Sequence, residues 1–191
     1  MPHWLRLTAM TRELVPQRLD VTTFAADGAT LSGRTPLRDF TRLAAETTGA
    51  SPEAEVSWTA EGEQRPGVTG APAPWLHLEA DALVPLVCQR CLAPVDVELT
   101  VDRWFRFVAD EETAAIEDEE AEEDILVASR DFDLHALLED ELLMEIPVTP
   151  RHDTCPDAPP LSATDSDFDL AEGAKPNPFA VLGKLRGGKP E

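Results

Sequence analysis

The segment LHLEADALVPLVCQRCLAPVDVELTVDRWFRF, residues 76–107, predicts the central element of the fold. Apolar side chains occupy every second position in its first and last parts. They are Leu76, Leu78, Ala80, Ala82, Val84 and Leu86, followed by Val95, Val97, Leu99, Val101, Phe105 and Phe107. Because successive side chains of a strand point to opposite faces, each run predicts a strand with one apolar face. The two runs predict a long β-hairpin, in which the charged Arg103 interrupts the pattern.

The connection of this hairpin, VCQRCLAP, carries two of the three cysteines, Cys88 and Cys91. A four-ligand zinc site would need two more donors, and His152 and Cys155 offer them at a similar spacing. A redox pair would need a stabilised thiolate, for which Arg90 is the only cation nearby. A structural turn with free thiols is the simplest interpretation, because no glycine follows the pairs and Cys155 lies in a proline-rich stretch. All three interpretations stay open, with redox chemistry the least supported.

Shorter patterns flank the hairpin on both sides. Alternation predicts strands over residues 18–25 and 53–61, and a short apolar run predicts another over 125–128. Residues 35–49 predict a helix with Thr35 as its cap and Gly49 as its stop. A second helix begins after Asp133, with a leucine stripe inside and Glu139, Asp140 and Glu141 outside.

An acidic segment, residues 110–124, holds ten acidic residues and no basic residue. Blocks of like charge are usually solvated and mobile, so we expect a mobile loop. An alternative is that the block attracts a basic partner by imitating a polyphosphate. A two-metal carboxylate site is less well supported, because nothing in the segment predicts a scaffold for metal geometry.

The overall charge points to a basic partner. The 191 residues contain 37 acidic and 16 basic side chains, for a formal net charge of −21. Such a chain repels bare nucleic acid and anionic membranes and attracts basic proteins. The start of the sequence does not read as a secretory signal, so we expect a cytoplasmic protein. No serine–histidine–carboxylate arrangement, phosphate-binding glycine loop or HExxH motif occurs, so the sequence predicts no enzyme.

The C-terminal part differs from the rest. Residues 151–176 are rich in Pro, Asp, Ser and Thr and read as a linker, and residues 177–186 predict a short amphipathic segment. This segment is expected to dock onto the chain's own surface or onto a ribonucleoprotein, and both options stay open. Its docking residues would be Asn177, Pro178, Phe179, Leu182 and Leu185. Residues 175–191 carry four cations against one anion.

Together these patterns predict an α+β fold. An antiparallel sheet would surround the long hairpin, with two packed helices, the acidic mobile loop and a partly disordered C-terminal tail. Residues 1–150 would form the core domain, residues 151–176 the linker and residues 177–186 the amphipathic segment.

Several pieces resemble the YceD family, which is named for large ribosomal RNA subunit accumulation. They are CQRCLAPV with the strand after it, the acidic stretch, the leucine-rich segment from Asp133 to Cys155, and the ending KPNPFAVLGKLR. The resemblance covers about residues 14–186. It implies a role in ribosome biogenesis and no established catalytic activity. Other branches of the family carry further cysteines near the C-terminal end that look like zinc ligands, and only Cys155 matches them here, so His152 is our own candidate for the fourth ligand.

Two functions follow as expectations. The first is a non-catalytic ribosome biogenesis factor that binds a basic ribosomal protein or a large-subunit precursor particle, with any contact to ribosomal RNA indirect. The alternative is direct RNA binding through the basic tail, helped by Arg103, Arg106 and an exposed Trp104. Strand parity places Arg103 on the opposite face from the other two, which weakens the RNA hypothesis.

Overall fold

A computed structural model describes residues 14–68, 70–119, 121–157 and 179. The chain forms two units, Met1–Thr154 and Cys155–Glu191. All the helices and strands described here lie in the first unit. Of the described residues, none lies in a helix long and apolar enough to cross a membrane.

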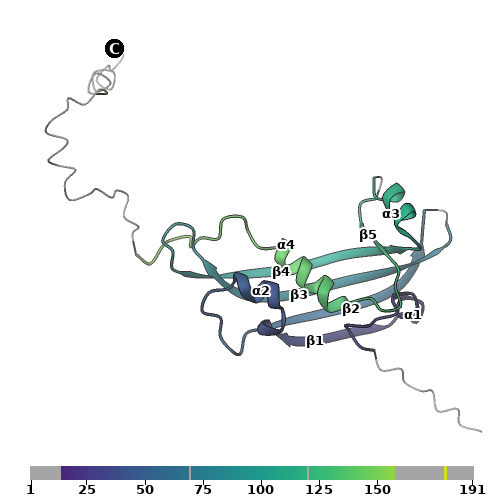
Figure 1. Cartoon of the computed structure of the whole chain (residues 1–191), viewed down its shortest axis with the longest axis horizontal. Coiled ribbons are helices and arrows are strands. Elements are labelled where there is room, and N and C mark those ends of the chain that lie inside the picture. The colour runs from purple at the N-terminus through teal and green to yellow at the C-terminus, as the bar shows by residue number, and fades with distance from the viewer. Residues whose placement is uncertain (1–13, 69, 120, 158–178, 180–191) are drawn as a thin grey trace, which may run out of the picture. The chain divides into compact units, whose positions relative to one another are not determined.

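A five-stranded sheet with the order β1-β2-β3-β4-β5 forms the centre of the first unit (Figure 1). Its strands are β1 (Thr30–Pro36), β2 (Glu55–Pro66), β3 (Pro72–Val87), β4 (Pro94–Val108) and β5 (Asp124–Val127). The first four strands form an antiparallel meander, and β3 pairs with β4 from Trp75↔Arg106 to Val87↔Pro94. The predicted α+β fold and its long hairpin are therefore confirmed. The sheet is mixed rather than purely antiparallel, because β5 pairs parallel to β4.

Three helices cover one face of this sheet (Figure 1). They are α1 (Val21–Ala26), α2 (Thr41–Glu46) and α4 (Leu134–Met144); a short 3₁₀ helix, η1 (Leu37–Asp39), precedes α2, and α3 (Glu111–Glu117) follows β4. The buried leucines Leu134, Leu138 and Leu142 of α4 pack in one core with the alternating apolar residues of β3 and β4. The leucine stripe of the second predicted helix therefore faces the core as expected.

The strand predicted over residues 18–25 was wrong, because α1 occupies most of it. Leu19 forms only an isolated antiparallel bridge to Phe132. Asp20 then accepts a hydrogen bond from the backbone nitrogen of Thr23 at 3.1 Å and caps the helix. The β-branched residues at positions 21–23 favoured a strand, and this cap outweighs that preference.

The helix predicted over residues 35–49 begins later than expected. Thr35 and Pro36 end β1, and α2 starts at Thr41 without a side-chain cap of its own. The Glu139 carboxylate of α4 supplies the cap from 97 residues away, accepting from the backbone nitrogens of Arg42 at 2.7 Å and Leu43 at 3.2 Å. Glu139 is consequently buried, and Glu141, which lies near Arg103, is buried too, which corrects the prediction that both lie outside.

The acidic segment is not a loop throughout. Asp110 caps α3 by accepting from the backbone nitrogen of Thr113 at 2.8 Å, and β5 begins at Asp124. The buried Arg106 of β4 pairs with Glu117 and Glu123. These contacts neutralise part of the charge that predicted a mobile loop.

Candidate metal centre

The hairpin tip between β3 and β4 is a tight, hydrogen-bonded turn. The backbone nitrogen of Cys88 donates to the Ala93 carbonyl, and that of Leu92 donates to the Cys88 carbonyl, both at 2.9 Å. Leu92 has φ 61° and is the only non-glycine residue with positive φ among the described residues. The turn therefore uses a left-handed residue where a glycine would be unstrained, and holds Cys88 and Cys91 on the same side.

The segment after α4 lies against this turn. The Gln89 nitrogen donates to the Pro150 carbonyl at 2.8 Å, which fixes the backbone two residues before His152. Nδ1 of His152 then lies 3.5 Å from Sγ of Cys91. This contact joins residues that are 61 positions apart in the sequence. Nothing in the sequence pattern indicated the Gln89–Pro150 hydrogen bond that brings the two segments together.

All four sequence-predicted ligands come together. Cys88, Cys91, His152 and Cys155 each offer one donor atom, and these atoms lie within 4.8 Å of one another. Cys88 is fully buried and the other three are half-buried. Tetrahedral zinc with Zn–S of about 2.3 Å and Zn–N of about 2.0 Å would set sulfur and nitrogen ligands about 3.5 Å apart, which is the Cys91–His152 separation. The cluster can therefore hold a metal ion, and its donor types suit zinc.

The Cys88 thiol is already prepared to act as a ligand. Burial raises its pKa, but backbone hydrogen bonds from Cys91, Arg90 and His152 and the His152 side chain lower it by more, to about 5. The thiolate form, which binds metals, is thus the main form of Cys88 at neutral pH.

The residues considered for RNA binding are engaged in the fold. Arg106 is 3% exposed and paired as described above. Arg103 lies near carboxylates of α4, 3.8 Å from Glu141 and 3.5 Å from Glu145, which explains why it interrupts the apolar pattern. Trp104 is half-buried rather than exposed, stacked on His77 with ring centroids 4.2 Å apart. These three residues do not form a free basic and aromatic surface.

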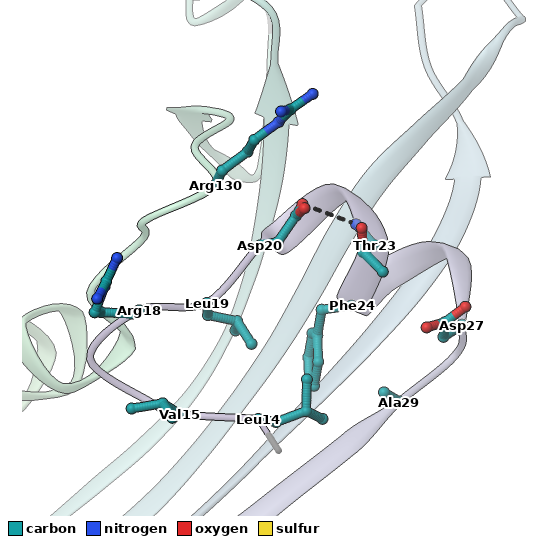
Figure 2. Close-up of a pocket in the computed structure, with 10 residues that line it drawn as sticks. All are labelled: Leu14, Val15, Arg18, Leu19, Asp20, Thr23, Phe24, Asp27, Ala29 and Arg130. Carbon is teal, nitrogen blue, oxygen red and sulfur yellow. Dashed lines mark hydrogen bonds between the residues drawn. The ribbon is translucent and has the colours of Figure 1, made fainter. Parts of the chain in front are cut away.

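A pocket of about 250 Å³ lies beside α1 (Figure 2). Leu14, Leu19 and Phe24 form its apolar side, and Arg18 and Asp20 lie on its rim. Arg18 forms an exposed ion pair with Asp131 at 3.1 Å, and Asp20 caps the helix. These two polar groups of the pocket thus serve local structure.

Most of the predicted docking residues of the tail, Asn177, Pro178, Leu182 and Leu185, lie outside the described residues. Phe179 is described and is 68% exposed. The docking role of this segment stays a prediction.

The fold and the cluster define a small α+β protein with a candidate metal centre at one hairpin tip. Residues 76–186, more than half of the chain, match the family model described as large ribosomal RNA subunit accumulation protein YceD. The chain therefore belongs to the YceD family, whose name links it to the accumulation of large-subunit ribosomal RNA. No solved structure matches the chain.

Proposed function

We propose that this chain is a non-catalytic, cytoplasmic ribosome biogenesis factor. It supports the accumulation or processing of large-subunit ribosomal RNA by binding a basic ribosomal protein or a precursor particle that presents one. Family membership is the observation that carries this proposal. The net charge of −21 supports a basic protein, rather than bare RNA, as the direct partner.

Direct RNA binding is the alternative, and the described residues give it little support. Among the described residues of the first unit, six arginines form ion pairs with acidic side chains: Arg18, Arg38, Arg42, Arg65, Arg103 and Arg106. Four further described arginines, Arg34, Arg90, Arg130 and Arg151, form no ion pair. The RNA hypothesis nevertheless assigns the contact mainly to the basic residues 175–191, where the amphipathic segment 177–186 lies.

We further propose that zinc binds Cys88, Cys91, His152 and Cys155 in a structural role. Four protein ligands leave no open position for a substrate or a reactive water, which is typical of structural zinc sites. The ion would join the β3–β4 tip to the segment that follows α4.

Sedimentation of cell extracts tests the proposed function. The full chain should co-sediment with large-subunit precursors at low salt, and the association should survive nuclease treatment but weaken steeply as salt rises. Loss of all association after nuclease would instead favour RNA binding. Cells that lack the protein should contain less large-subunit than small-subunit ribosomal RNA, and unchanged proportions would contradict the proposal.

A further inference from the structure

The face of the sheet opposite α1, α2 and α4 carries a group of exposed carboxylates. Because strand side chains alternate, the core-facing residues of β2, β3 and β4 are separated by residues that point the other way. We call five of these outward, exposed residues the acidic face: Glu61, Glu79, Asp81, Glu98 and Asp102.

Two carboxylates of the acidic face lie directly opposite each other. Glu79 of β3 pairs in register with Asp102 of β4. Their carboxylate oxygens lie within 4.8 Å of each other and of the ring of His77. Like charges at directly opposed positions destabilise an antiparallel pair. The stability of the sheet therefore does not account for this arrangement.

Few cations of the described residues lie at the acidic face; Arg34 of β1 lines a hollow with Glu79 and Asp81 but forms no ion pair with either. Asp102 contacts Nε2 of His77 at 2.7 Å, and Asp81 accepts a hydrogen bond from the Thr100 hydroxyl at 3.2 Å. Within the part of the chain that the structure describes, Glu61, Glu79 and Glu98 form no ion pair. The face thus presents a negative field to whatever approaches it.

Apolar groups border the carboxylates at both ends. Towards the β2–β3 loop, Trp104 is stacked between neighbours, with His77 at 4.2 Å and the Arg65 guanidinium 3.5 Å from its ring centroid. Trp75 meets the same ring edge-on at 6.4 Å. Towards the hairpin tip, Leu83 points outward and is 60% exposed, opposite Glu98. Tryptophan is enriched at protein-binding surfaces, and Leu83 and the open carboxylates beside the two tryptophans add apolar and charged contact points.

We propose that the acidic face binds an extended, arginine- and lysine-rich segment of a partner protein. One cationic side chain of the partner lies between Glu79 and Asp102, and aliphatic stems of others pack on Leu83. Charge complementarity selects this occupant, since an RNA backbone would be repelled by the same carboxylates. This inference rests on the proposed function, and it names the surface of the chain that binds the basic partner.

A defined probe tests this assignment on the full chain. The probe is a fluorescent twelve-residue peptide of alternating arginine and threonine, with binding followed by anisotropy at low and high salt. The variant Glu61→Gln/Glu79→Gln/Asp81→Asn/Glu98→Gln should bind about tenfold more weakly. The control Glu111→Gln/Glu112→Gln/Glu119→Gln/Glu122→Gln has the same change in net charge and should bind within about twofold of the parent. Equal losses in both variants, or a loss in neither, would overturn the assignment.

Stability provides a second readout of the acidic face. Because Glu79 faces Asp102, Glu79→Gln alone should raise the thermal midpoint while it weakens peptide binding. A lower midpoint would show that Glu79 serves the fold. If deletion of residues 175–191 strengthened peptide binding about tenfold, the chain's own basic tail would be the occupant, and the assignment to a partner would be wrong.

Sedimentation separates this inference from the proposed function. If the parent associates with large-subunit precursors and the acidic-face variant associates equally well, the acidic face is not the docking surface while the proposed function stands. If the parent itself fails to associate, the proposed function fails. Selective loss of association in the acidic-face variant supports both.

Discussion

Nδ1 of His152 lies 3.5 Å from Sγ of Cys91, across 61 residues of sequence. The Gln89–Pro150 backbone hydrogen bond brings the two segments side by side, and no metal ligand takes part in it. The first unit therefore brings Cys88, Cys91 and His152 together by its own folding, so that an ion would be received by a largely preformed site.

The first prediction concerns metal content. Protein prepared without added metal should contain about one zinc per chain, and Cys88→Ser, Cys91→Ser and His152→Asn should each lose most of it. Elemental analysis by mass spectrometry measures this directly. His135→Gln is a matched control, because His135 stacks on Phe40 and not on the cluster. A parent without zinc would contradict the proposed centre.

A second prediction follows from the left-handed backbone of Leu92. Its side chain is 75% exposed, so replacing it loses little packing, while glycine adopts φ 61° without strain. Leu92→Gly should therefore raise the free energy of unfolding by about 1 kcal/mol in a urea titration. Ala93→Gly, at a neighbouring residue without positive φ, should lower it by about 0.5 kcal/mol instead. A loss at both positions would mean that the Leu92 side chain itself supports the turn.

The third prediction concerns the cap that Glu139 provides for α2. Glu139→Ala removes the acceptor for two backbone N–H groups and the partner of Arg42, and should lower the free energy of unfolding by about 2 kcal/mol. Asp140→Ala is the control, since Asp140 also pairs with Arg42 but is exposed; it should cost about 0.5 kcal/mol. Similar losses in both variants would contradict the capping role.

The elements that the sequence predicted well depend on local patterns. The β3–β4 hairpin has a long period of two that only Arg103 interrupts in the sequence, and Asp133 caps α4 as expected, accepting from the Ala136 nitrogen at 2.9 Å. The ligand pairs Cys88/Cys91 and His152/Cys155 were found from their local spacing, while the sequence left zinc open beside a redox pair and a structural turn. The register of β4 also placed Arg103 and Arg106 on opposite faces as predicted.

The predicted strand over residues 18–25 failed because of a local cap, but two other predictions failed because of contacts with residues outside the predicted segment. Nothing near Thr41 indicates that Glu139 caps its helix, and nothing within residues 110–124 indicates that Arg106 pairs with Glu117 and Glu123. Most of the acidic face could have been predicted from the sequence. The alternation of side chains along a strand places Glu79, Asp81, Glu98 and Asp102 on the face opposite the core. Only the register between β3 and β4 shows that Glu79 and Asp102 lie side by side.

The fourth prediction is a pH dependence that Glu141 imposes on stability. Burial raises its pKa above the ordinary 4.5, opposed by the nearby charge of Arg103 and assisted by Asp124, Asp140 and Glu145. At pH values between 4.5 and this raised pKa, Glu141 is protonated more often in the folded chain than in the unfolded chain. The stability that protonated Glu141 contributes is therefore fully present below pH 4.5, and it is lost as the pH rises through the raised pKa.

Urea midpoints measured from pH 4 to pH 8 check this prediction. Glu141→Gln removes the titrating group and keeps its shape, so it should be at least as stable as the parent at pH 7 and should lose less stability between pH 4 and pH 7. Glu53→Gln is the control, because Glu53 is exposed and is not one of the charges that shift the pKa of Glu141, so the stability of this variant should follow the pH profile of the parent. A Glu141→Gln variant that is clearly less stable at pH 7 would show that the attraction of Arg103 outweighs the cost of burying the carboxylate.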